Sequence, residues 1–237
     1  MAGCIILELV NRAKKMIIPI VGRMPMKGLY GLFEWVARMA YVNVLWILFS
    51  ILGAGVLGVG PATLSAFTVI RKRLREGEGF STWQVFANTY RNEFWEGNKL
   101  TLLLLPIYLF IYVDFSIIQT LPYDVFIDYI VFPALLLLSV LVVILSSYLF
   151  AVHAHFDLPF WKYVTYAVLA AGISPLSVVL IIFGLALISL LAFLFPATLL
   201  FFGVSIPVLL IQACALQAFG KMETFQLNQQ RVKHQAR

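Results

Sequence analysis

Residues 53–75, GAGVLGVGPATLSAFTVIRKRLR, decide the fold of this chain. Glycines and Pro61 interrupt an apolar run that begins near Met39, and the basic cluster Arg71–Arg75 ends it. Residues 39–70 form either one long helix or a tight hairpin that turns back around Gly55 to Gly60. Which of these two structures the chain adopts determines how many times it crosses a membrane.

The composition identifies an integral membrane protein. Of the 237 residues, 62% are hydrophobic and only 12% are charged, with a mean hydropathy of +0.95, whereas an ordinary globular domain carries about 25% charged residues. The net charge of +6 would suggest nucleic acid binding in a soluble protein. In a membrane protein it indicates basic residues that anchor the cytoplasmic side, so we expect the lipid bilayer as a partner and no nucleic acid.

The charge distribution favours the hairpin. Basic residues lie on both sides of 39–70, from Arg12 to Arg38 before it and from Arg71 to Lys99 after it. A single crossing would place these groups on opposite sides of the membrane, against the rule that basic loops stay cytoplasmic. The second limb of a hairpin, 57–70, would be about 21 to 24 Å long, short of the roughly 30 Å hydrocarbon core. Arg71 and Lys72 would make up the difference by extending to the interface.

We therefore predict an all-α polytopic membrane protein with six transmembrane helices and both termini in the cytoplasm. In this arrangement all 17 Lys and Arg residues lie on the cytoplasmic side, and the outer loop after the third span carries Asp but no Lys or Arg. The predicted spans are 39–54, 57–70, 100–118, 129–152, 174–195 and a last one that follows the outer turn at Pro196 and ends near Phe219.

Three regions follow from these spans. They are a cytoplasmic or interfacial segment 1–38, a single transmembrane domain 39–220 and a polar cytoplasmic tail 221–237. The first 30 residues lack a compact apolar run that ends in a small-residue cleavage site, so we expect no cleaved signal peptide. Cys4 and Cys214 lie at opposite ends of the chain without metal-ligand spacing, which predicts free thiols.

Two aromatic segments are too polar to span a membrane. Aromatic residues recur every three or four positions in 80–96 with polar residues between them, and a second segment at 156–166 has a similar character. This spacing predicts amphipathic helices that lie in the cytoplasmic interface or against a partner protein. An interface belt is the commoner use of such aromatic stripes, and the two uses are compatible. The candidate partner-binding residues are Trp83, Phe86, Tyr90, Arg91, Phe94, Phe160 and Trp161.

Catalytic motifs are absent from the sequence: it contains no nucleophile elbow, phosphate-binding loop, zinc-binding helix signature or dinucleotide fingerprint. We expect no enzymatic activity, no cofactor and no metal. His153, His155 and Asp157 are the strongest polar cluster. A continuous helix would place His153 and Asp157 on one face and His155 on another, which favours an interfacial role over metal binding or a proton relay.

Polar residues and glycines within the spans are candidates for a path or for helix contacts. An acid inside a membrane is a functional candidate, but Asp114 lies near the outer end of its span, where water reaches it. Asn43 is most simply used for a hydrogen bond between helices, and glycines allow a sharp turn or close backbone approach. The candidate turn or path residues are Asn43, Gly58, Gly60, Pro61 and Asp114.

Several short motifs resemble the YesL-like family of bacterial membrane proteins of unknown function, over about residues 30 to 220. The motifs are Asn43-Val44-Leu45-Trp46, Gly58-Val59-Gly60-Pro61-Ala62, Val69-Ile70-Arg71-Lys72 and the aromatic segment with Trp83, Phe86, Tyr90-Arg91-Asn92 and Phe94. Such proteins are typically encoded beside carbohydrate ABC importers and polysaccharide-degrading enzymes. The resemblance implies an accessory role in oligosaccharide uptake.

Two functional hypotheses follow. The first is a non-catalytic accessory subunit of a carbohydrate ABC importer that binds the permease, with the ATPase as a second candidate partner. The alternative is a self-sufficient small-solute transporter or channel, with a path lined by the glycine turn, Asn43 and Asp114. In both cases we expect a multi-pass protein of the bacterial cytoplasmic membrane.

Overall fold

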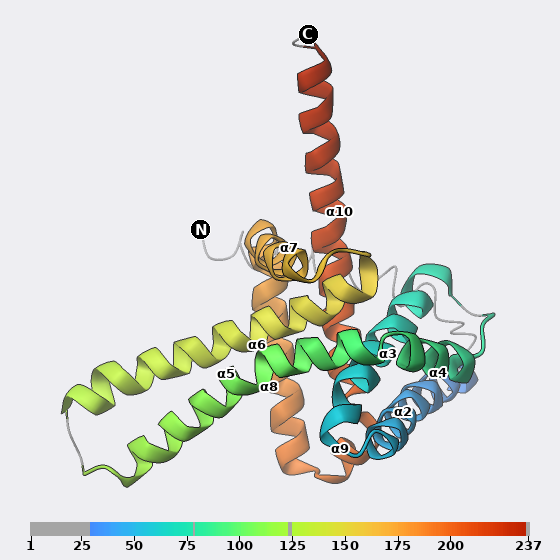
Figure 1. Ribbon diagram of the computed structural model, residues 1–237. Coiled ribbons are helices and arrows are strands. Elements are labelled where there is room, and N and C mark those ends of the chain that lie inside the picture. The colour runs from blue at the N-terminus through green and yellow to red at the C-terminus, as the bar shows by residue number, and fades with distance from the viewer. Residues whose placement is uncertain (1–28, 78, 123–124, 236–237) are drawn as a thin grey trace.

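The computed structural model describes residues 29–77, 79–122 and 125–235, and all regular structure in these ranges is helical (Figure 1). This confirms the predicted all-α class. The helices are α2 (Leu29–Leu52), α3 (Val56–Glu76), α4 (Thr82–Asn92), α5 (Phe94–Thr120), the π-helical turn η1 (Ile127–Val131), α6 (Phe132–His155), α7 (Phe160–Ile173), α8 (Pro175–Leu194), α9 (Ala197–Phe202) and α10 (Ser205–Gln235).

Helices α2 and α3 form the predicted hairpin. Ala54 and Gly55 adopt positive φ angles of 59° and 75° between the two helices. The Trp46 indole Nε1 donates a hydrogen bond to Thr63 Oγ1 at 3.0 Å. This contact joins one limb to the other and shows that the limbs run antiparallel, which excludes one continuous helix over 39–70.

The position of the turn differs from the prediction. The chain turns at Gly53–Gly55, whereas Gly58, Gly60 and Pro61 lie inside α3. A Cβ atom at Gly58 would lie 2.3 Å from the carbonyl oxygen of Ser50 on α2. The later glycines are thus used for close approach between helices, which a glycine pattern alone does not distinguish from a turn.

Five helical segments are long and apolar enough to cross a membrane: Tyr30–Leu52, Phe94–Thr120, Ile127–His155, Pro175–Leu194 and Ser205–Met222. The chain is therefore a multi-pass membrane protein. The predicted second span, α3, is not among them, because its apolar part from Val56 to Ile70 is shorter than the roughly 20 residues of a typical span. The count of six spans stays a prediction.

Helix ends also differ from the predicted boundaries. Helix α2 begins at Leu29, within the predicted interfacial segment 1–38, of which residues 1–28 lie outside the described chain. The predicted last span is broken into α9 and α10, and α10 continues through the predicted tail as far as Gln235.

Helix α3 is the centre of the fold. It contacts α2, α4, α5, α6 and α10, and Figure 1 shows it among these helices. Its buried side chains include Leu64, Phe67 and Ile70, each exposed by no more than 2%. In contrast, α5 and α6 form a second hairpin that projects away from the other helices (Figure 1), with exposed leucines such as Leu102 and Leu137. Exposed apolar residues of this kind are typical of a lipid-facing surface.

The backbones of α3 and α5 approach each other closely at two glycines. A Cβ atom at Gly60 would lie 2.5 Å from the carbonyl oxygen of Gly97, and one at Gly97 would lie 2.7 Å from the Pro61 Cα atom. Real Cβ atoms do not approach backbone this closely, so a larger residue at either position must separate the helices.

We therefore expect Gly97→Ala to lower the free energy of unfolding by about 1–3 kcal/mol. The matched control is Gly172→Ala in α7, where no atom outside the surrounding turns of its own helix lies within 4 Å of the added Cβ, and this change should be neutral or slightly stabilising. Thermal unfolding of the purified proteins in detergent measures both. Equal stability of the two variants would contradict the proposed contact.

Candidate functional site

A polar cavity lies where α3, α4 and the junction of α6 and α7 meet. Its volume is about 340 Å³, within the roughly 300–1,000 Å³ range of small-molecule sites. The lining residues are Leu64, Thr68, Arg71, Val85, Asn88, Thr89, Asn92, Glu93, His153, Ala154, Asp157 and Tyr163.

The amphipathic pattern of α4 places its polar side against this cavity. Ser81 caps the helix by accepting a hydrogen bond from the Gln84 N–H at 3.4 Å. Phe86 and Tyr90 are buried on one side of α4. Asn88 and Asn92, four residues apart, share the other side and line the cavity together with Glu93, which follows the helix.

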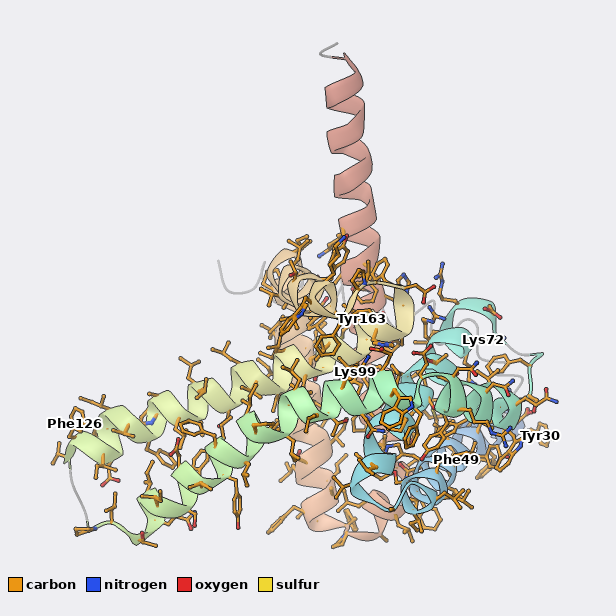
Figure 2. The ribbon with its side chains drawn as sticks, viewed as in Figure 1. Tyr30, Phe49, Lys72, Lys99, Phe126 and Tyr163 are labelled. Atoms are coloured by element: carbon orange, nitrogen blue, oxygen red, sulfur yellow. The ribbon has the colours of Figure 1, made fainter. Side chains whose placement is uncertain are left out.

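The end of α6 and the first turn of α7 supply the aromatic wall. The rings of His153 and Tyr163 stack with their centroids 4.4 Å apart, and Figure 2 shows Tyr163 beside this junction. The Tyr163 hydroxyl accepts a hydrogen bond from the Leu158 N–H at 3.1 Å, which holds the connection between α6 and α7. His153 is nine-tenths buried, and its Nε2 atom has no hydrogen-bond partner within the described part of the chain.

Charged groups of both signs line the cavity. The Arg71 guanidinium donates a hydrogen bond to the His155 carbonyl oxygen at 3.3 Å, and burial lowers the pKa of Arg71. Burial, and then the nearby carboxylates of Glu96 and Asp157, raise the pKa of Glu93. The folded protein therefore holds each of these charges at a free-energy cost.

His155 and Asp157 do not join His153 in a metal site. His155 packs against the ring of Phe219, with centroids 4.8 Å apart, while His153 stacks on Tyr163. Asp157 lies beyond the end of α6 and is exposed. No group of three or more His, Cys, Asp or Glu residues could hold a metal ion in residues 29–77, 79–122 and 125–235.

The aromatic face of α4 is covered by α2. The rings of Trp83, Phe86 and Tyr90 lie 5.5, 5.2 and 4.9 Å from the ring of Phe49. Phe86 is fully buried and Tyr90 is 9% exposed. These two residues, predicted as partner contacts, therefore belong to the core of the chain, because the α2–α3 hairpin supplies the apolar surface that α4 needs.

The other predicted partner residues are more exposed. Trp83 and Trp161 retain 47% and 74% of their surface. Arg91 is exposed, whereas Phe94 and Phe160 are half-buried. Only three of the seven predicted partner residues, Trp83, Arg91 and Trp161, are therefore exposed.

The predicted path residues do not meet. Asn43 lies on α2, and its amide group bonds to backbone atoms at the α9–α10 break. Gly58, Gly60 and Pro61 are buried in α3. Asp114 is half-buried on α5, in the projecting hairpin. The structure therefore offers no continuous path that these residues line.

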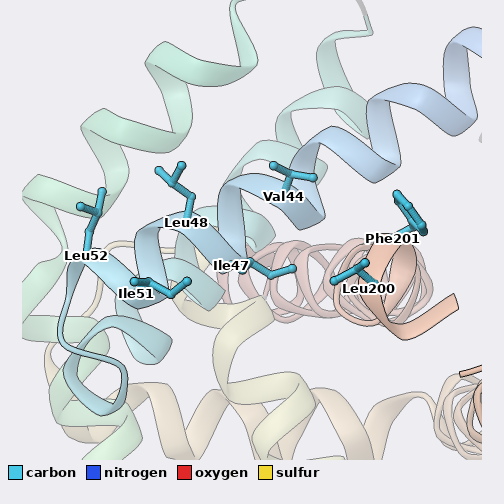
Figure 3. A pocket seen from close by; sticks show the side chains of 7 residues that line it. All are labelled: Val44, Ile47, Leu48, Ile51, Leu52, Leu200 and Phe201. Carbon is cyan, nitrogen blue, oxygen red and sulfur yellow. The ribbon is translucent and has the colours of Figure 1, made fainter. Parts of the chain in front are cut away.

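An apolar groove lies between α2 and α9, with a volume of about 480 Å³. Figure 3 shows its side chains, which all come from these two helices. They are Val44, Ile47, Leu48, Ile51, Leu52, Leu200 and Phe201. Because α2 is one of the apolar segments long enough to span, this groove is suited to contact with lipid chains.

The comparisons with known proteins identify the family. Residues 39–115 match a family model described as "Protein of unknown function, DUF624". The uncharacterized protein YteU of Bacillus subtilis (strain 168) is 33% identical over 177 residues, which cover 73% of this chain and 77% of YteU. The uncharacterized protein YesL of the same organism is 31% identical over 196 residues, which cover 83% of this chain and 91% of YesL.

The chain belongs to the YesL-like DUF624 family. No solved structure matches it. The region matched by the family model runs from within α2 into α5 and includes Arg71, Asn88 and Glu93 of the cavity. His153, Asp157 and Tyr163 lie outside it, so the cavity of this YesL-like protein joins residues from both parts of the chain.

Sequence reasoning found His153 and Asp157 but missed most of the cavity. The spacing of Asn88 and Asn92, followed at once by Glu93, places polar groups along one side of α4. Arg71 is the first charge after the apolar run of α3. Both signals are present in the sequence, but nothing in it shows that α4 and the end of α6 lie on the same side of α3.

We expect Asn43→Ala to destabilise this YesL-like protein by about 1–3 kcal/mol, because buried backbone groups lose their partners. Asn43 Nδ2 donates to the Leu200 carbonyl at 2.7 Å, and Asn43 Oδ1 accepts from the Val204 N–H at 2.8 Å. Thermal unfolding in detergent measures the change. Gln119→Ala, at an exposed amide of α5, is the control, and an equally small effect of both substitutions would contradict the role of Asn43.

We expect Glu93→Gln to raise the unfolding temperature at pH 7.5. The pKa of Glu93 is raised in the folded protein, so its contribution to stability is present below the unfolded-state pKa and is lost as the pH rises through the folded-state pKa. The gain from Glu93→Gln should therefore shrink towards pH 4.5. Asp128→Asn, at an exposed acid, controls for general charge effects, and a lower unfolding temperature of Glu93→Gln at pH 7.5 would contradict the prediction.

Proposed function

We propose that this YesL-like protein is a non-catalytic accessory subunit of a carbohydrate ABC importer in the bacterial cytoplasmic membrane. In this proposal it binds the permease, and the ATPase is a second candidate partner. The family resemblance implies the class of transported substrate, oligosaccharides. The multi-pass architecture fits a subunit that packs beside a permease in the bilayer.

The observation that carries the proposal is the pair of exposed indoles on α4 and α7. Trp83 and Trp161 are 47% and 74% exposed, and the cations Arg91 and Lys162 nearby in sequence are exposed as well. Helices α4 and α7 border the same cavity, so they lie at one end of the fold. Exposed Trp and Arg are the residue types that most often dominate the binding energy of protein interfaces.

The alternative is a self-sufficient small-solute transporter. It requires a polar route across the apolar helices, and the residues predicted for such a route are separated in the fold. In this case the polar cavity would be the binding site for the transported solute. Uptake of a labelled sugar by liposomes that contain only this protein would favour the alternative.

The proposed topology places both termini and the cavity in the cytoplasm, with the α2–α3 turn outside. Basic residues at the end of α3, including Arg71 and Lys72, support this orientation. We expect Val56→Cys, at a 67% exposed position beside the turn, to react with a membrane-impermeant maleimide in intact cells. Arg75→Cys, at an exposed position near the other end of α3, should react only after permeabilisation, and the reverse pattern would contradict the topology.

Purification of the tagged protein from its native membrane in mild detergent tests the partner proposal. Mass spectrometry should find a sugar-importer permease and ATPase in a fixed ratio to this chain. The double substitution Trp83→Ala and Trp161→Ala should reduce their recovery at least fivefold at equal expression.

The matched control is Phe193→Ala, which removes an 83% exposed aromatic ring near the end of α8 and should leave recovery unchanged. Recovery of this chain alone, or only with itself, would contradict the accessory-subunit proposal. Undiminished recovery with the double substitution would contradict this contact surface.

A further inference from the structure

The polar cavity holds opposite charges that do not meet. Arg71 on α3, Glu93 after α4 and Asp157 after α6 all line it. The ion pairs of the described chain involve other residues, such as Lys72 with Glu76 and Lys99 with Glu96. Arg71, Glu93 and Asp157 make no ion pair within 4.0 Å in residues 29–77, 79–122 and 125–235.

Leaving these charges apart is unfavourable for the folded chain. Arg71 is half-buried and has one hydrogen bond, to the His155 carbonyl oxygen. Glu93 is also half-buried, and the carboxylates of Glu96 and Asp157 add to the free energy of holding its negative charge. Partly buried charges of this kind are usually paired with an opposite charge. A ligand that carries both charges would compensate the two sides of the cavity at once.

The neutral groups of the cavity suit a polar ligand as well. Asn88 and Asn92 present amide groups that both donate and accept hydrogen bonds. His153 is nine-tenths buried in the wall of the cavity and has an unpartnered Nε2 atom in the described chain. Leu64 and Val85 add apolar surface. This mixture is typical of a small-molecule site with a few polar groups that set orientation.

We propose that this cavity binds a small zwitterion, with the anionic group on Arg71 and the ammonium group between Glu93 and Asp157. Arginine is suited to phosphate and carboxylate because its planar guanidinium presents several donors in one fork. Asp157 attracts Arg71 without a direct ion pair. A ligand with one charge would pair directly with only one side of the cavity, and a neutral polyol with neither. This proposal does not depend on the accessory-subunit function.

The position of the cavity allows two sources for this chemistry. It lies at the ends of α3 and of the apolar segment Ile127–His155, beside the basic residues of α3. A membrane-spanning helix ends at this level among lipid headgroups. The zwitterion is therefore either the headgroup of phosphatidylethanolamine or a soluble molecule of the same class, such as phosphoethanolamine.

Calorimetric titration of the purified full-length protein in an uncharged detergent tests the proposal. Phosphoethanolamine should bind at least tenfold more tightly than inorganic phosphate or ethanolamine alone. Native mass spectrometry with phosphatidylethanolamine and phosphatidylglycerol distinguishes the sources. Selective retention of phosphatidylethanolamine assigns the lipid headgroup, and binding of phosphoethanolamine without lipid selectivity assigns a soluble ligand. The proposal would be overturned if the protein neither bound phosphoethanolamine nor selectively retained phosphatidylethanolamine. It would also be overturned if inorganic phosphate bound as tightly as phosphoethanolamine.

Substitutions in the cavity test the assignment of each charge. Glu93→Gln and Arg71→Gln should each weaken binding at least tenfold. The controls Asp128→Asn and Lys162→Gln, at exposed charges that do not line the cavity, should leave it unchanged. Because Glu93→Gln is expected to stabilise the fold, its loss of binding would not reflect unfolding. Unchanged affinity in both cavity variants would overturn the proposal.

Discussion

The close approach of backbones along the first half of α3 determines the rest of the fold. Gly58 lies against Ser50 of α2, and Gly60 lies against Gly97 of α5, with no room for a side chain at either contact. These contacts let α3 pack against α2, α4, α5, α6 and α10. Once α3 is placed there, its charged end is fixed beside the ends of α4 and α6. The polar cavity is thus a consequence of the packing of apolar helices below it.

The opposite sides of α4 have different uses. Its aromatic side is buried against Phe49 and contributes to the core. Its polar side, with Asn88 and Asn92, lines the cavity. A small rotation of α4 would unpack its aromatic side from Phe49 and move Asn88 and Asn92 away from the cavity. The stability of the hairpin and the geometry of the cavity are therefore linked through this helix. That packing holds Arg71 and Glu93 without a direct ion pair in the described part of the chain, which lowers the stability of the folded state.

Sequence reasoning predicted the helical class and the hairpin, because charge clusters and apolar runs act over whole segments. It placed the turn a few residues too far along the chain, because Gly58 is used for close helix packing. A glycine needed for a turn and one needed for packing cannot be distinguished in a sequence. It also assigned Phe86 and Tyr90 to a partner surface, because an amphipathic pattern shows that a face must be covered but not by what. The break between α9 and α10 was not predicted. Its backbone groups are bonded by Asn43, which lies over 150 positions away along the chain. The cavity was missed for the same reason: its residues meet only in the fold.

Disulfide cross-linking in native membranes tests the hairpin most directly. Trp46→Cys and Thr63→Cys would be combined in a chain with Cys4→Ala and Cys214→Ala and with a protease site inserted after Ala54. The hydrogen bond between Trp46 and Thr63 predicts that a short bifunctional methanethiosulfonate, which couples to each cysteine through a disulfide, joins the two positions, so that the fragments stay together after cleavage until a reductant is added. In one continuous helix the two positions would be about 25 Å apart at 1.5 Å per residue, beyond the reach of such a linker. Fragments that separate without reductant would contradict the hairpin, the central position of α3 and the cavity that depends on it.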